Sequence, residues 1–206
     1  MPRPFSSDES DRIRARLEEV GQQAFAQRGL RGATVDELAR GAGISKGAFY
    51  RFYDSKESLF LALLEDHETA MHAELEASVR ANPAGAVDFL IDSAVHALDR
   101  HPLLAVLMTP EGLRILQACP AEQQARLLDR DVRMVHRVAE VLHESGHDIE
   151  VPERVLLGLL RSLVFVGLHR EEIGPDAVEE VATWLKQTLK AGLHQASGSG
   201  NRRPHR

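Results

Sequence analysis

Apolar residues recur every three to four positions along most of the chain, which is the pattern of amphipathic helices. The clearest cases are residues 10–28, 56–80 and 121–144, and shorter stretches of the same kind fill much of the remainder. No stretch alternates apolar and polar residues over the length of a strand. The pattern therefore predicts an all-α fold of about nine helices.

The residue pattern over 34–56 predicts two short helices that are joined by a tight turn and followed by the start of a third helix. Thr34 can cap the first helix, and Glu37 completes a capping box because it stands three residues later. Gly43 can adopt the positive φ that the turn needs. Ser45 can cap the second helix. This arrangement is typical of a helix-turn-helix.

Three residues in the same stretch oppose helix stability. Lys46 and Lys56 lie in first turns, where the helix dipole disfavours a cation, and Gly47 costs about 1 kcal/mol relative to alanine. A phosphate-binding role would explain them, because helix N-termini bind anions. Gly47 and Ala48 leave room for a close approach, and the Tyr50 hydroxyl can reach a phosphate oxygen. The alternative is a solvated turn with incidental lysines.

The charge distribution agrees with contact to nucleic acid at one end only. The chain has 206 residues and a net charge of −6, with 25 Lys and Arg against 31 Asp and Glu. Residues 1–56 contain 10 of the basic and 8 of the acidic residues, a balance of +2, which leaves 15 and 23, a balance of −8, for residues 57–206. A mildly basic head on an acidic body fits a protein that touches DNA with its head.

The last two predicted helices favour self-association. Residues 155–168 are apolar around most of the helix circumference, and residues 176–192 can pair with them antiparallel. Two such pairs would form a four-helix bundle across a twofold axis. We therefore expect a homodimer through about residues 152–192, and the alternative is that both helices are monomer core.

The middle helices, about residues 84–144, are short and interrupted by prolines. Such packing can leave a cavity for a small molecule. Each candidate polar residue of its wall also fits a surface role or a role as a satisfied core residue. The candidates are Asp92, Ser93, His96, Arg114, Gln117, His136 and Arg161.

Other chemistry has little support in the sequence. The single cysteine, Cys119, permits neither a disulfide within the chain nor a cysteine-based zinc site. The ten histidines show no metal-binding spacing on a helix, and no nucleophile elbow, phosphate loop or dinucleotide fingerprint is present. We find neither a signal peptide nor an apolar run long enough for a membrane span. We therefore expect a cytoplasmic protein that is not an enzyme and has no cofactor and no metal.

The segment TVDELARGAGISKGAFYRFYDSKESLF resembles the DNA-binding signature of the tetracycline-repressor-like (TetR) family of transcriptional regulators. The resemblance covers about residues 10–64, and the helical remainder is similar to that family only in architecture. It implies a homodimer that binds operator DNA and is released by a small molecule. The family's DNA contacts fall at positions occupied here by Thr34, Ser45, Lys46, Gly47, Phe49, Tyr50 and Lys56.

Within this scheme we expect Lys46 and the backbone of Gly47 and Ala48 to lie in the major groove. The residues expected to contact phosphates are Thr34, Tyr50, Arg51 and Lys56. Arg51 replaces a histidine that is common in the family. Tyr53 replaces a phenylalanine and fits either the core, which we favour, or a further phosphate contact.

The resulting hypothesis has three parts along the chain: a helix-turn-helix DNA-binding domain over 10–56, a ligand-binding and dimerisation domain over 57–193, and a disordered tail over 194–206. The leading function is a homodimeric repressor that a small-molecule ligand releases from a palindromic operator. An activator fits the same pattern. A helical small-molecule carrier or interaction module without operator binding is the alternative from another class.

Overall fold

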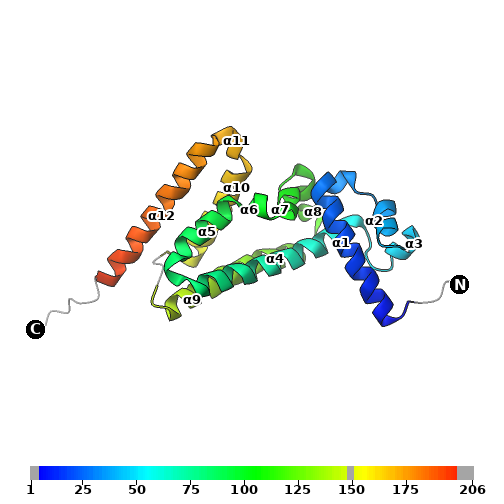
Figure 1. The fold of residues 1–206 in the computed structure, drawn as a ribbon, viewed down its shortest axis with the longest axis horizontal. Helices are drawn as coiled ribbons and strands as arrows, with labels where there is room; N and C mark the ends of the chain where they lie inside the picture. Colours follow the sequence, from blue (N-terminus) through cyan, green and yellow to red (C-terminus); the bar gives the residue numbers. More distant parts are fainter. Residues whose placement is uncertain (1–4, 148–150, 199–206) are drawn as a thin grey trace, which may run out of the picture. The chain divides into compact units, whose positions relative to one another are not determined.

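The fold is all-α, as predicted, in a computed structural model that describes residues 5–147 and 151–198 (Figure 1). Over these residues there is no strand. Twelve α-helices and one 3₁₀ helix follow in chain order within the described part: α1 (Ser7–Gly32), α2 (Val35–Gly41), α3 (Lys46–Phe49), α4 (Lys56–Ala81), η1 (Pro83–Gly85), α5 (Ala86–Val95), α6 (Ala97–Arg100), α7 (Pro102–Leu107), α8 (Pro110–Ala118), α9 (Ala121–Glu144), α10 (Glu153–Leu168), α11 (Arg170–Ile173) and α12 (Pro175–Gly198).

The helix count exceeds the expected nine partly because two histidines interrupt predicted helices. His96 has a ψ of 15° and separates α5 from α6. His169 has a ψ of 26° and separates α10 from α11. The apolar spacing continues across both breaks, so periodicity alone does not reveal them. The helix α12 ends at Gly198, and residues 199–206 of the expected tail lie outside the described residues.

The chain divides into two compact units. The head unit comprises residues 1–69 and 101–119, and the body unit comprises residues 70–100 and 120–206. The head unit therefore contains α1, α2, α3, α7, α8 and the first part of α4. The sequence predicts a division by function instead, with a DNA-binding domain that ends at residue 56 and a ligand-binding and dimerisation domain that ends at residue 193. That functional division stays a prediction.

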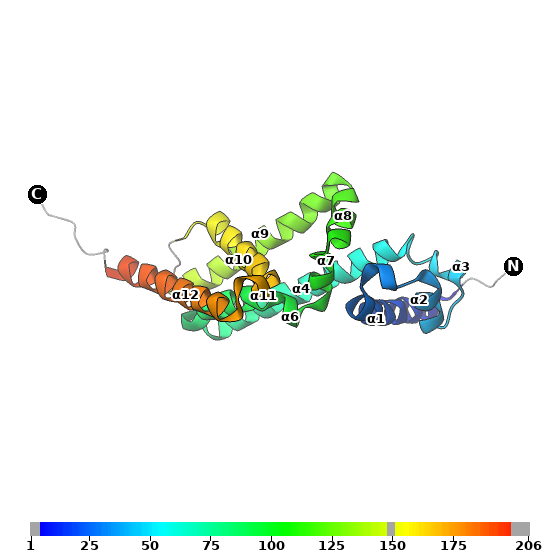
Figure 2. The same cartoon turned by 90° about the horizontal axis from the view of Figure 1, so that it is seen from above.

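The head core is built on large aromatic and aliphatic side chains. Phe25 of α1 and Phe60 of α4 meet edge to face with their ring centroids 5.4 Å apart. Leu17, Leu38 and Phe49 are also fully buried in this cluster. The helix α2 packs against both α1 and α3 (Figure 2). The core therefore holds the two short helices of the predicted helix-turn-helix against the longer α1.

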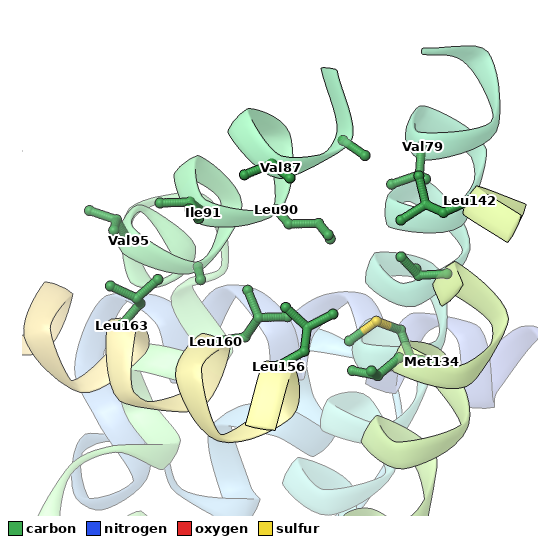
Figure 3. Packing of buried hydrophobic residues seen from close by; sticks show 14 of the residues in the cluster. Val79, Val87, Leu90, Ile91, Val95, Met134, Leu142, Leu156, Leu160 and Leu163 are labelled. Carbon is green, nitrogen blue, oxygen red and sulfur yellow. The ribbon is translucent and has the colours of Figure 1, made fainter. Parts of the chain in front are cut away.

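The body core lies where α5 meets α10 and α12, and α10 also packs on α9. Figure 3 shows Leu156, Leu160 and Leu163 of α10 pointing toward α5. Gly167 permits the close approach of these two helices, because a Cβ at this position would lie 2.4 Å from the carbonyl oxygen of Val95. Gly167 therefore lets α10 approach α5 closely within one chain.

None of the helices in the described part of the chain is both long and apolar enough to cross a membrane.

Candidate nucleic-acid interface

The helix α2 begins with the predicted capping box. The Thr34 hydroxyl accepts a hydrogen bond from the Glu37 backbone N–H at 3.3 Å, and the Glu37 carboxylate accepts one from the Thr34 backbone N–H at 3.2 Å. The Thr34 side chain and then Arg28 lower the pKa of the Glu37 carboxyl by hydrogen bonding to it. The cap therefore fixes where α2 begins and leaves Thr34 on the exposed surface.

The turn between α2 and α3 is also as predicted. Gly43 has a φ of 73°, in the left-handed region that favours glycine. Ser45 then caps α3, because its side-chain oxygen accepts a hydrogen bond from the Ala48 backbone N–H at 3.2 Å. These two local devices allow a helix of only four residues to follow the turn directly.

A single aromatic anchor orients α3. Phe49 is 0% exposed and lies in the head core, so its side chain supports the helix from below. Ser45, Lys46 and Gly47 are exposed, and Tyr50 at the end of the helix is 49% exposed. The structure thus leaves most of the predicted DNA-binding residues accessible and buries Phe49.

Gly47 has no packing role within the chain. Apart from its two chain neighbours and the backbone of its own helix, no heavy atom of the described residues lies within 4 Å of the place where a Cβ would stand. The backbone of Gly47 is therefore open to a close approach from outside, and the neighbouring Ala48 is partly exposed.

The cations on this surface have different partners. Lys46 Nζ donates to Asp36 Oδ2 at 2.8 Å, and this hydrogen bond raises the pKa of the Lys46 ammonium. The guanidinium of Arg51 lies over the ring of Phe5, 4.8 Å from its centroid. Both side chains are exposed, so both can exchange these partners for phosphate oxygens.

Lys56 lies in a different environment. Its Nζ donates to the backbone oxygens of Leu30 and Ala33 at 2.6 and 2.9 Å. These carbonyls belong to the end of α1, where helix carbonyls lack partners. Lys56 is half-buried and caps that helix. Its ammonium group has three N–H donors, so one N–H can still donate to a further acceptor.

Tyr53 is a core residue, in agreement with our interpretation of the sequence. It is buried, and its hydroxyl donates to Glu18 Oε1 at 2.8 Å. Burial, followed by this hydrogen bond, raises the pKa of Tyr53 to about 12. Tyr50 is thus the tyrosine that faces outward.

The seven residues predicted to line a ligand pocket fall in both units. Arg114 and Gln117 are exposed on α8 of the head unit. The other five belong to the body unit, where Asp92 forms an ion pair with Lys186, and His96 Nδ1 lies 3.0 Å from Arg170 Nη2. The first contact joins α5 to α12, and the second joins the C-cap residue of α5 to α11.

The remaining three candidates also have partners. Ser93 accepts a hydrogen bond from Arg100 at 3.4 Å. His136 lies 2.9 Å from Glu153, and this hydrogen bond raises the pKa of His136. Arg161 forms an ion pair with Asp131 at 2.7 Å. Among the described residues, these side chains form contacts between helices, and their role in a ligand pocket stays a prediction.

The outward faces of α10 and α12 carry apolar side chains that nothing in the described chain covers. Phe165 is 52% exposed and Trp184 is 62% exposed, and Val155 and Val181 are also open. Apart from its two chain neighbours and the backbone of its own helix, no heavy atom of the described residues lies within 4 Å of where a Cβ would stand at Gly158. The two helices therefore bury one face in the body core and leave a second apolar face open.

A family model described as "Bacterial regulatory proteins, tetR family" matches residues 19–63, which include α2, the turn and α3. Over this segment the chain is similar to TetR-family regulators. The helix-turn-helix predicted from the sequence and the surface built by α2 and α3 lie in the segment that this match covers.

Two transcriptional repressors and the solved structure of a transcriptional regulator are also similar to this chain. The transcriptional repressor AcnR of Corynebacterium diphtheriae is 28% identical over 193 residues, which cover 90% of this chain and 96% of AcnR. The repressor NemR of Escherichia coli is 40% identical over 62 residues, 30% of this chain and 31% of NemR. The solved structure of the regulator FadR of Bacillus subtilis, a complex with stearoyl-CoA, shares the fold with a TM-score of 0.60 at 14% identity and covers 86% of this chain and 98% of FadR.

Two features of this chain could not be found by sequence reasoning. A cavity of about 320 Å³ in the head unit is lined by Glu18, Glu19, Gln22, Leu63, Asp66, His67 and Leu103. None of the predicted pocket residues lines it. Periodicity could not reveal it, because its walls come from three helices that are separated in the sequence.

The second feature is a partly buried charge cluster in the body, in which only His72 is fully buried. His72 Nε2 lies 3.2 Å from Asp131, and Arg161 binds the other oxygen of the same carboxylate. Burial alone would raise the pKa of Asp131, but the His72 and Arg161 side chains outweigh it and hold that pKa below its usual value. In the sequence, the one sign of this cluster was His72, a polar residue in an apolar part of α4. Within the described residues, no three His, Cys, Asp and Glu side chains gather as a metal site would require.

Proposed function

We propose that this chain is a homodimeric transcriptional repressor whose two heads bind a palindromic operator and which a small-molecule effector releases. The observation that carries the proposal is the exposed surface of α3. There Ser45, Lys46, Gly47 and Tyr50 face outward, while Phe49 anchors the helix from below. The similarity of residues 19–63 to TetR-family regulators and the similarity to the repressor AcnR support the same function.

The DNA contacts divide into two kinds. Lys46 and the backbone of Gly47 and Ala48 enter the major groove, where a short side chain and an open backbone permit close approach. The phosphate contacts come from Thr34, Tyr50, Arg51 and the remaining donor of Lys56. Ser45 and Phe49 support α3 as its cap and its anchor.

Two copies associate through the outward apolar faces of α10 and α12, within the expected region 152–192. Phe165 and Trp184 are large and exposed, which is costly in water unless a partner covers them. Gly158 leaves room for a facing helix. A dimer also supplies two heads, and two heads bind two half-sites of one palindrome.

The effector binds in the body, where the candidates are Asp92, Ser93, His96, His136 and Arg161. The complex of Bacillus subtilis FadR with stearoyl-CoA supports the capacity of this fold to take a small molecule. Binding favours a conformation in which the spacing of the heads no longer matches two half-sites. Arg114 and Gln117, on α8, are weaker candidates because they lie on the surface of the head unit.

Selection of bound sequences from a library of random duplexes tests the proposal with the full-length chain. We expect the selected duplexes to share a palindromic motif. A variant with Lys46→Ala and Tyr50→Phe should lose the enrichment, while both chains should show the same circular dichroism spectrum. Recovery of no motif by the wild-type chain would favour the alternative, a helical small-molecule carrier or interaction module without operator binding.

A further inference from the structure

Two acidic residues in the first turn of α2 hold two cations of the head. Lys46 Nζ donates to Asp36 Oδ2 at 2.8 Å, and Arg28 Nη1 donates to Glu37 Oε1 at 3.0 Å. Glu37 has a second task, because it completes the capping box. Asp36 pairs with Lys46 and with no other residue of the described chain. The position of Asp36 therefore needs an explanation of its own.

Asp36 works against simple attraction of DNA. It places a negative charge beside Lys46, the lysine that the proposed function puts in the major groove of DNA. An acid in the first turn does favour the helix dipole, but Glu37 already supplies one there. A surface that only had to attract phosphates would be better served by an uncharged residue at position 36.

The pair affects the two modes of DNA binding differently. Binding to any sequence depends on how many phosphates are neutralised, and each contributes about −0.9 to the slope of log affinity against log salt. A lysine that is already paired contributes little, because exchanging one exposed ion pair for another gains almost nothing. When base contacts seat α3 in the groove, Lys46 is held close to DNA and the exchange becomes favourable.

We propose that Asp36 is a specificity-determining residue, which keeps Lys46 from the phosphates of other sequences and releases it only when α3 is seated in the major groove of the operator. This inference rests on the proposed function, since it presupposes that α3 docks on DNA. It concerns the ratio of operator to random-sequence affinity rather than the operator affinity alone.

The test compares full-length wild-type chain with Asp36→Asn by fluorescence anisotropy over a series of KCl concentrations. The probes are a duplex of random sequence and the duplex recovered by selection. We expect Asp36→Asn to bind the random duplex about fivefold more tightly near 0.1 M salt, with a slope steeper by about 0.9 for each head. The operator affinity should rise less, so that the ratio of the two affinities falls.

Asp8→Asn is the matched control. Asp8 is exposed, occupies the second position of α1 as Asp36 does in α2, and its carboxylate pairs with no cation of the described residues. Its substitution removes the same charge and should change neither slope nor ratio. In a Lys46→Gln background, Asp36→Asn should have no effect on the random duplex, because the lysine it restrains is absent.

Two results would overturn the inference. One is an unchanged slope for Asp36→Asn when thermal unfolding shows that the variant is folded. The other is an equal gain in the Lys46→Gln background, which would mean that Asp36 merely repels phosphates. Failure of the proposed function is seen separately, because the wild-type chain would then show no preference for any selected duplex.

Discussion

The outward surface of the head and the outward surface of the body differ in the kind of side chain they leave uncovered. Eight large hydrophobic side chains are exposed among the described residues, and Tyr50 is the one that belongs to the head unit. The other seven belong to the body unit, and Phe165 and Trp184 are the largest. Around Tyr50 the exposed residues are polar, charged or glycine.

This difference indicates two kinds of partner. An exposed apolar face gains free energy when it is removed from water, at roughly 25 cal/mol for each Å², so it suits a second protein surface. A polar surface with paired charges is stable in water and suits a partner that offers charges in exchange, such as DNA phosphates. Each prediction below tests whether the two surfaces are as separate in function as they are in composition.

The largest effect is expected from Trp184→Asp. The substitution places a charge on the apolar face of α12, and in a symmetric dimer it occurs twice. Large aromatic residues at interface centres contribute about 2 kcal/mol or more, so dimer association should weaken by at least about thirtyfold. Analytical ultracentrifugation should show a monomer at micromolar concentration, and operator affinity should fall with it.

Thr183→Asp is the matched control, because Thr183 is exposed and polar and is turned about 100° away from Trp184 on the same helix. It should leave both the dimer and the operator affinity unchanged. A Trp184→Asp chain that stays dimeric would show that the apolar face of α12 is not the dimer interface.

The next effect concerns the head alone. Gly47→Ala introduces a methyl group into open space, so α3 should gain about 0.5–1 kcal/mol of helix stability. If DNA approaches this backbone closely, operator affinity should nevertheless fall by about tenfold, because a clash of this kind costs about 1.4 kcal/mol or more. Thermal unfolding and anisotropy on the same samples measure the two quantities. Higher stability with unchanged affinity would remove Gly47 from the interface.

Local features of both units could be predicted from the sequence because they depend on residues that are neighbours in the chain. The cap at Thr34, the turn at Gly43 and the cap at Ser45 all require particular residue types at fixed short spacings. The apolar character of α10 and α12 was visible for the same reason. The sequence did not show which apolar side chains of α12 are turned outward.

Contacts between distant residues could not be predicted in this way. Lys56 caps the end of α1, which lies 23 to 26 residues earlier, and no periodic pattern reports such a contact. The candidate pocket residue Asp92 pairs with Lys186, which lies 94 residues later. Polar residues in the body therefore looked like possible ligand contacts, while the structure shows many of them joining helices.

Lys56 and Lys46 should separate stability from DNA binding. Lys56→Met removes the donor to two carbonyls and should lower the free energy of unfolding by about 1–2 kcal/mol. Lys46→Met removes an exposed ion pair and should change that free energy by less than about 0.5 kcal/mol. Urea unfolding measures both. The salt dependence of DNA binding should become shallower for Lys46→Met, and a similar change for Lys56→Met would show that its third donor also holds a phosphate.

The smallest effect is expected from an exposed contact of the body, between His136 of α9 and Glu153 of α10. Its hydrogen bond to Glu153, with the charges of Glu153 and Glu140, raises the pKa of His136 above 6.5. Stability from protonated His136 is therefore fully present below the unfolded pKa and is lost as the pH rises through the raised folded pKa. Urea unfolding should show wild type more stable than His136→Gln near about pH 5.5, with the difference gone near about pH 9. Glu153→Gln should abolish most of this pH dependence, and an undiminished dependence in that variant would assign it to Glu140 or to another histidine. Neither variant should alter the salt dependence of DNA binding, because the pair joins body helices and the proposed phosphate contacts all lie in the head.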